Sequence, residues 1–124
     1  MKRWIVGTTL LFLLSCNRSP ADKIATPSAP TPVELVKGET LFNRNCSRCH
    51  GSRGTGSSFG PPFLSKIYEP SHHGDEAFHL AARNGVQSHH WNLGNMPPYA
   101  HLSDAEVDEI VRYVRWLQKE AGIF

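Results

Sequence analysis

Residues 46–50 read Cys-Ser-Arg-Cys-His, and this run constrains the fold of the chain more than any other feature. Residues three apart on a helical turn share one face, so Cys46 and Cys49 can both reach one edge of a flat cofactor. His50 follows at once and can ligate a metal at the centre of that cofactor through a neutral imidazole. Cys-x-x-Cys-His is the attachment signature of covalent haem c. The sequence therefore predicts one haem held by two thioethers, with His50 as an iron ligand.

Two other uses of a Cys-x-x-Cys pair have to be weighed against haem. A thioredoxin-like redox disulfide belongs in a βαβ context, and the sequence around the motif has no such alternation of strand and helix signals. A zinc site needs two further ligands, and the chain offers 7 histidines in all. We favour haem, and a zinc-binding module, which would leave the protein colourless, stays an alternative.

The chain begins like an exported protein. Two basic residues, Lys2 and Arg3, precede an apolar run from Trp4 to Leu14, and this layout predicts a secretory signal peptide over residues 1–15. The run is too short to span a membrane, which takes about 20 residues. Export fits the predicted cofactor, because bacterial haem c is attached after the chain has crossed the inner membrane. We therefore expect a protein of the bacterial periplasm.

A lipid anchor is predicted at the end of this leader. Leu13-Leu14-Ser15-Cys16 resembles the lipobox of bacterial lipoproteins, which implies that Cys16 is acylated and holds the protein on a membrane. Asn17 slightly favours the outer membrane. Residues 16–32 are rich in proline, alanine, serine and threonine, a composition that favours an extended tether. Residues 33–124 remain as one small domain.

The charge balance argues against a nucleic-acid partner. The chain has 13 lysines and arginines and 11 acidic residues, and removal of Lys2 and Arg3 with the leader would make the two counts equal. Nucleic-acid binding requires a concentrated basic face, which the mixed charges of the domain do not indicate. We expect a monomer whose partners are other redox proteins and, through its anchor, a membrane.

Helix signals frame the predicted domain. Thr31-Pro32-Val33-Glu34 offers a capping box with a proline for the first turn, and predicts a helix that leads into the haem motif. Asp75 to Arg83 predicts a short helix that Asn84-Gly85 stops. Ser103-Asp104-Ala105-Glu106 is a second capping box, and apolar residues follow it at helical spacing up to Gly122. No segment has the pattern of a strand, so we expect an all-α domain.

The arrangement resembles a small bacterial class I cytochrome c over the whole predicted domain. This implies an all-α fold of three to four helices packed around one covalently bound haem. Gly38 and Phe42 resemble the first-helix contact of that family, where a glycine lets the last helix cross closely beside an aromatic ring. Tyr113, with Trp116 or Leu117, is the expected counterpart on the last helix.

The same resemblance implies roles for three residues beyond the haem motif. Gly60-Pro61-Pro62-Phe63 is similar to the family's Gly-Pro-x-Leu segment, with phenylalanine in place of leucine, which implies that the Pro61 carbonyl accepts the ring N–H of His50. Gly94-Asn95-Met96-Pro97-Pro98-Tyr99 resembles the family's Met-Pro ligand loop, so the soft thioether of Met96 would be the second protein ligand of the iron. Trp91 is placed like the tryptophan that donates its indole N–H to a haem propionate.

Iron ligated by both His50 and Met96 has no open position for a substrate. This favours a single-electron carrier that shuttles between redox proteins over an enzyme, although the sequence names neither donor nor acceptor. A haem enzyme or gas sensor, in which Met96 would dissociate readily, lacks any legible catalytic residue near the motif.

The pairs His72-His73 and His89-His90 do not belong to the carrier pattern. Neutral imidazole suits copper, zinc or nickel, so an alternative function is a haem- and copper-binding module that delivers electrons to copper proteins or senses them. Adjacent histidines do not readily chelate one ion together, and no recognised ligand spacing joins the two pairs. Ordinary surface histidines are therefore the favoured interpretation.

Overall fold

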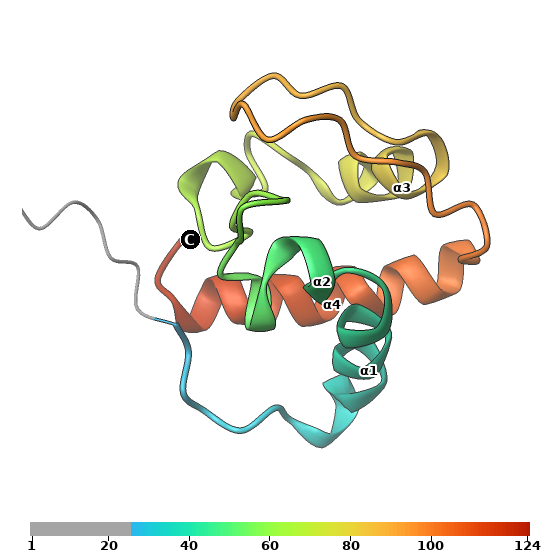
Figure 1. Ribbon diagram of the computed structural model, residues 1–124. Helices are drawn as coiled ribbons and strands as arrows, with labels where there is room; N and C mark the ends of the chain where they lie inside the picture. The colour runs from blue at the N-terminus through green and yellow to red at the C-terminus, as the bar shows by residue number, and fades with distance from the viewer. Residues whose placement is uncertain (1–25) are drawn as a thin grey trace, which may run out of the picture.

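The computed structural model describes residues 26–124, and the regular secondary structure of this part of the chain is helical (Figure 1). Its elements are η1 (Val33–Leu35), α1 (Val36–Asn45), α2 (Ser47–His50), η2 (Ser52–Gly54), η3 (Lys66–Tyr68), α3 (Asp75–Asn84) and α4 (Asp104–Glu120). Within these residues, extended backbone pairs only in an isolated antiparallel bridge between Val86 and Met96. The expectation of an all-α domain is confirmed.

Several predictions concern residues outside this description. The signal peptide, the acylated Cys16 and the first part of the tether all fall there, and they stay predictions. Among the helices of residues 26–124, none is long and apolar enough to cross a membrane.

The C-terminal helix α4 is the longest element, and it begins at the predicted capping box. The Ser103 hydroxyl accepts the backbone N–H of Glu106 at 3.3 Å, and the Ser103 N–H donates to Glu106 Oε2 at 2.9 Å. The apolar residues that recur along α4 form its buried face, namely Val107, Ile110, Val111, Tyr113, Val114 and Leu117. The helix therefore presents one continuous apolar stripe to the rest of the domain.

Gly38 allows the close crossing of α1 over α4 (Figure 1). A Cβ atom at Gly38 would overlap the backbone carbonyl oxygen of Glu109 and would lie 3.0 Å from Tyr113 Cβ. One turn later the ring of Phe42 packs on that of Tyr113, with centroids 5.5 Å apart, and both side chains are fully buried. The predicted contact of glycine and aromatic ring between the first and last helices is confirmed.

The first helix begins differently from the prediction. Residues Val33–Leu35 form the 3₁₀ turn η1, capped by Pro32, and α1 starts only at Val36. The Thr31 hydroxyl is buried without a hydrogen-bond partner, so the predicted capping box of Thr31 and Glu34 is wrong. The reason is that the helical run starts from Pro32, which leaves the threonine one residue too early to cap it.

The last residues of the predicted tether lie against the domain. Residues 26–32 contain no helix, as expected of an extended segment, yet Pro27 is buried. The Ala29 carbonyl accepts a hydrogen bond of 2.9 Å from Arg53 Nη2, and the same guanidinium lies 5.2 Å from the centre of the Trp116 ring. The extended segment is thus held on the domain surface before it enters η1.

Replacing Gly38 with alanine should destabilise the protein, because the added methyl group must push α1 away from the Glu109 carbonyl. Overpacking of this kind costs about 1–3 kcal/mol, and we expect a loss of that size in the free energy of unfolding measured by guanidinium denaturation. Gly74→Ala is the matched control, since a Cβ there would lie 3.7 Å from the nearest atom, the Pro70 carbonyl oxygen. Equal losses in the two variants would contradict the close-crossing role of Gly38.

Candidate functional site

One helical turn delivers the three residues of the Cys-x-x-Cys-His motif. Cys46 lies at the junction of α1 and α2, where its backbone N–H donates to the Phe42 carbonyl at 2.8 Å. The N–H groups of Cys49 and His50 both donate to the Cys46 carbonyl, at 3.1 and 2.9 Å. This tight turn sets all three side chains on the wall of one cavity, and the two thiols are free of any disulfide.

The cavity has a volume of about 600 Å³ and its wall is mostly apolar. Its lining comes from α2, α3 and α4 and from the loops that precede and follow α3. It includes Phe63, Phe78, Leu102, Val107 and Ile110. Pockets of about 300–1,000 Å³ are the size that holds cofactors and drug-sized ligands. A flat apolar group larger than any side chain would therefore find room beside the two cysteines.

His50 is held in one orientation and in one tautomer. Its Nδ1 lies 2.9 Å from the Pro61 carbonyl oxygen, and because a carbonyl can only accept, Nδ1 must carry the proton. The ring also stacks on Phe63, with centroids 4.2 Å apart and planes inclined by 17°. Burial lowers the pKa of His50, an effect that the Pro61 carbonyl partly opposes. A neutral imidazole therefore keeps its Nε2 lone pair for a metal.

Met96 lies on the wall of the same cavity, and its backbone is fixed on both sides. It exchanges two hydrogen bonds with Val86, at 2.9 and 3.0 Å, and the nearby Tyr99 N–H donates to the Ala82 carbonyl at 2.6 Å. Gly85 has φ +74°, and a Cβ there would lie 2.5 Å from the Met96 carbonyl oxygen. Only glycine accommodates both that backbone conformation and that close approach.

The two cysteines are poor candidates for a zinc site. A structural zinc site needs four ligands that lie together. In residues 26–124, the one group of three or more potential metal ligands that lie together contains no cysteine. The zinc interpretation of the motif therefore has no support from the geometry.

The Cytochrome c family model matches residues 35–118. The chain belongs to the cytochrome c family. A cytochrome bc1 complex cytochrome c subunit from Corynebacterium diphtheriae is 26% identical over 86 residues. That alignment covers 68% of this chain and 27% of the relative, so the cytochrome spans about a quarter of the relative's length. No solved structure matches the chain.

The residues of the site fit the cofactor of this family. Two partly buried thiols, an imidazole with a free Nε2 and an apolar cavity are what covalent attachment and iron ligation of a porphyrin require, and Cys46, Cys49 and His50 supply the attachment motif. The cytochrome therefore carries one covalently bound haem c and is an electron-transfer haem protein. Its helices have the class I cytochrome c fold.

Trp91 lies beside the haem cavity. It lines a smaller hollow that also touches His50 and Met96, and its ring stacks on Tyr68, with centroids 5.8 Å apart and planes inclined by 5°. The half-buried indole thus packs as an aromatic, and its role toward a haem propionate stays a prediction.

Three residues that shape the site had no role in the sequence analysis. The sequence marks Phe63 only as a departure from leucine and Gly85 only as a helix stop, yet Phe63 stacks on His50 and Gly85 lies against the Met96 carbonyl. No sequence pattern indicates a role for Arg115, because it lies between apolar residues of α4. In the structure its guanidinium donates to the Tyr68 and His73 carbonyls at 2.7 and 2.6 Å. These roles arise from contacts between distant segments, which periodicity does not reveal.

The double variant Cys46→Ser, Cys49→Ser should be largely unfolded when no haem is attached. A domain of this size has a modest core. Without haem, the cavity of about 600 Å³ would stay unfilled, and the side chains on its wall would lack packing partners on that side. Far-ultraviolet circular dichroism should show most of the helical signal lost relative to the haem-loaded wild type. Native helix content in this variant would refute the dependence on haem.

Proposed function

We propose that the cytochrome is a single-electron carrier in which His50 and Met96 are the two protein ligands of the haem iron. The observation that carries this proposal is that Met96 lines the same cavity as Cys46, Cys49 and His50. Haem c supplies reversible one-electron chemistry when bound. The protein residues hold the two ligands, keep water from the cavity and leave no position for a substrate, so we propose a carrier and not an enzyme.

The backbone around Met96 supports its assignment as a ligand. Two hydrogen bonds with Val86 fix the main chain of Met96 itself, and Pro97 and Pro98 restrict the backbone that follows it. A thioether favours ferrous iron and raises the reduction potential. A methionine that served only as core filler would not need its main chain fixed so closely.

The contacts of His50 with Pro61 and Phe63 support its assignment as a rigid iron ligand. The Pro61 carbonyl at 2.9 Å holds the proton on Nδ1, and the stacked ring of Phe63 fixes the plane of the imidazole. Such partners increase the basicity of a ligating histidine and limit its movement. Little rearrangement on electron transfer means a small barrier, which is what a carrier requires.

We further propose that the cytochrome is exported, anchored through an acylated Cys16, and active in the periplasm as a monomer. The amino-terminal sequence supports export and acylation. The Corynebacterium relative is named as a subunit of a cytochrome bc1 complex, which makes membrane-bound redox complexes of that kind candidate partners. An anchor at Cys16 would keep the domain close to the surface of a membrane, with the outer membrane slightly favoured.

Met96→Ala should lower the reduction potential and open the iron to carbon monoxide. Loss of the thioether removes the ligand that favours ferrous iron, and axial ligands span a range of about 0.8 V in haem proteins. Potentiometric titration and carbon monoxide binding to the reduced protein measure the two effects, and the near-infrared band of an iron–sulfur bond should vanish.

Met96→His is the matched control for that experiment. It should lower the potential as well, but it should keep the iron closed to carbon monoxide because imidazole occupies the vacated position. An unchanged potential in Met96→Ala would remove Met96 from the ligand role and with it the proposed carrier centre.

Cys16→Ser should release the cytochrome from the membrane fraction without altering its visible spectrum. The substitution removes the acylated thiol, and stable anchoring depends on the acyl chains. Fractionation of cells that mature haem c, followed by haem staining, measures the distribution. A variant that stays with the membranes would overturn the lipid anchor.

A further inference from the structure

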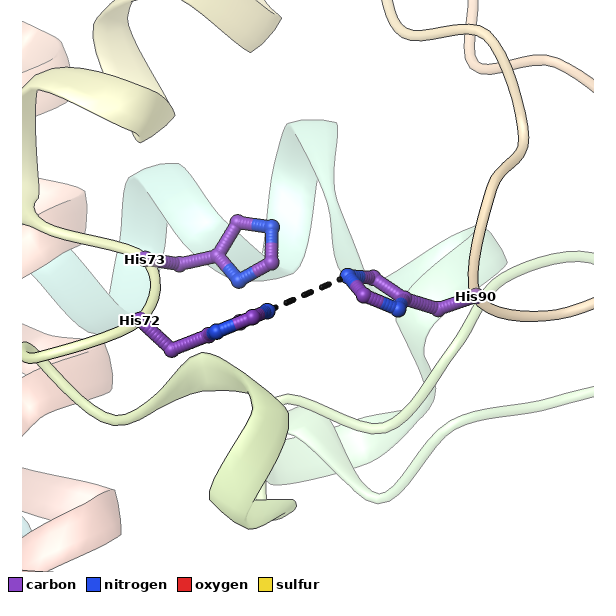
Figure 2. Close-up of side chains that lie close together, drawn as sticks. All are labelled: His72, His73 and His90. Atoms are coloured by element: carbon purple, nitrogen blue, oxygen red, sulfur yellow. Dashed lines mark hydrogen bonds between the residues drawn. The ribbon is translucent and has the colours of Figure 1, made fainter.

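His72, His73 and His90 come together from two separate loops beside the haem cavity. One ring nitrogen from each lies within 4.8 Å of those from the other two. Figure 2 shows His72 and His73 approaching from one loop and His90 from the facing loop, with a dashed line joining His72 and His90. The two Nε2 atoms on that line are 3.3 Å apart. The two adjacent pairs in the sequence did not indicate that His90 would join His72 and His73 from a distant loop.

The ring of His73 is already oriented as a metal ligand would be. Its Nδ1 lies 2.6 Å from the Ile67 carbonyl oxygen, and since the carbonyl can only accept, the proton is on Nδ1 and the Nε2 lone pair is free. Metal-ligating histidines almost always donate their other ring N–H to a carbonyl or carboxylate in this way. His73 thus has the supporting hydrogen bond of a ligand and an unshared nitrogen.

The turn that carries His72 and His73 is fixed by α4. Arg115 donates to the Tyr68 carbonyl, to the His73 carbonyl and to Asp75 Oδ1 at 2.7, 2.6 and 2.8 Å. The backbone N–H groups of both histidines donate to the Glu69 carbonyl. The two rings therefore project from a turn that is anchored at both ends.

The loop that carries His90 is fixed to the same scaffold. The Val86–Met96 bridge closes this loop at its base. The stacking of Trp91 on Tyr68 holds its tip against the segment that leads to His72 and His73. The approach of the two loops is thus a consequence of packing between elements already fixed.

The spacing of the nitrogens is close to that of a metal site. Two nitrogens bound to one ion at about 2.1 Å each lie at most about 4.2 Å apart. The ring nitrogens of the three histidines all lie within 4.8 Å of one another, so small rotations of the side chains would bring them to a common ion. His72 and His90 are exposed, which gives an ion a path from solvent. The remaining coordination positions are left to water.

We propose that His72, His73 and His90 form a binding site for one divalent transition-metal ion. Imidazole ligands suit copper, zinc and nickel, and affinity for such sites rises toward copper(II), so copper(II) is the ion expected to bind most tightly. The site is separate from the iron ligands, and it does not depend on Met96 being one of them.

The test is calorimetric titration of the haem-loaded cytochrome with copper(II) and with zinc(II). The wild type should bind one equivalent of each, with copper(II) tighter. His90→Gln and His72→Gln should each weaken copper(II) binding at least tenfold. His101→Gln is the matched control, because His101 is also exposed but its Nε2 lies 3.1 Å from Asn45 Oδ1, away from the cluster, and it should bind like the wild type.

Two further measurements make the outcome decisive. The visible spectrum of each variant must match that of the wild type, which shows that the fold and the haem are intact. The copper(II) electron paramagnetic resonance spectrum should show coupling to several nitrogens in the wild type and to fewer in His90→Gln. Absence of a saturable site, or equal weakening by His101→Gln, would overturn the proposal.

Discussion

The fold is organised around an apolar cavity of about 600 Å³ in a small domain, and the wall of this cavity includes residues of the buried core. Protein interiors are normally packed with few voids larger than a water molecule. Here Phe63 and Ile110 belong to the buried core cluster and also lie on the cavity wall, so each packs on other side chains and also faces the space for the haem. The crossing of α1 over α4, at Gly38 and Phe42, is a contact made between protein groups alone. Covalent attachment suits such a fold, since it retains the cofactor that completes the core.

Helix α4 also helps to hold His50, the first candidate iron ligand, in its orientation. The Gln118 side chain is fully buried, and its Nε2 donates to the Phe63 and Tyr68 carbonyls at 2.9 and 3.1 Å. Phe63 in turn stacks on His50. The orientation of the His50 imidazole is therefore supported by a hydrogen bond from the last helix to the Phe63 carbonyl as well as by the Pro61 carbonyl. A buried amide that is fully paired stabilises one arrangement of the loop, because any other would leave its polar atoms without partners.

Local signals in the sequence were sufficient where the structure is itself local. The Ser103 capping box spans one helical turn, whereas the close contact at Gly38 was expected from the resemblance to the cytochrome c family and is confirmed by the structure. The prediction failed at Thr31, because whether a hydroxyl caps a helix depends on which residue starts the helical run. It was silent on Arg115 and on the meeting of His90 with the other histidines, because both depend on how two loops pack. Sequence periodicity carries no information about such contacts.

Tyr68 is the residue at which the haem site and the histidine cluster share their support. Its ring contacts Phe63 at 5.0 Å between centroids, Trp91 at 5.8 Å and His73 at 5.1 Å. Burial raises the pKa of Tyr68 to about 12, so the phenol stays neutral and acts as an apolar wedge at any physiological pH. Since Phe63 packs on His50 and Trp91 precedes Met96 in the same closed loop, a movement of Tyr68 would alter the surroundings of both iron-ligand candidates and of the histidines together. The two sites therefore share one aromatic side chain as a packing support, although their candidate ligands are distinct.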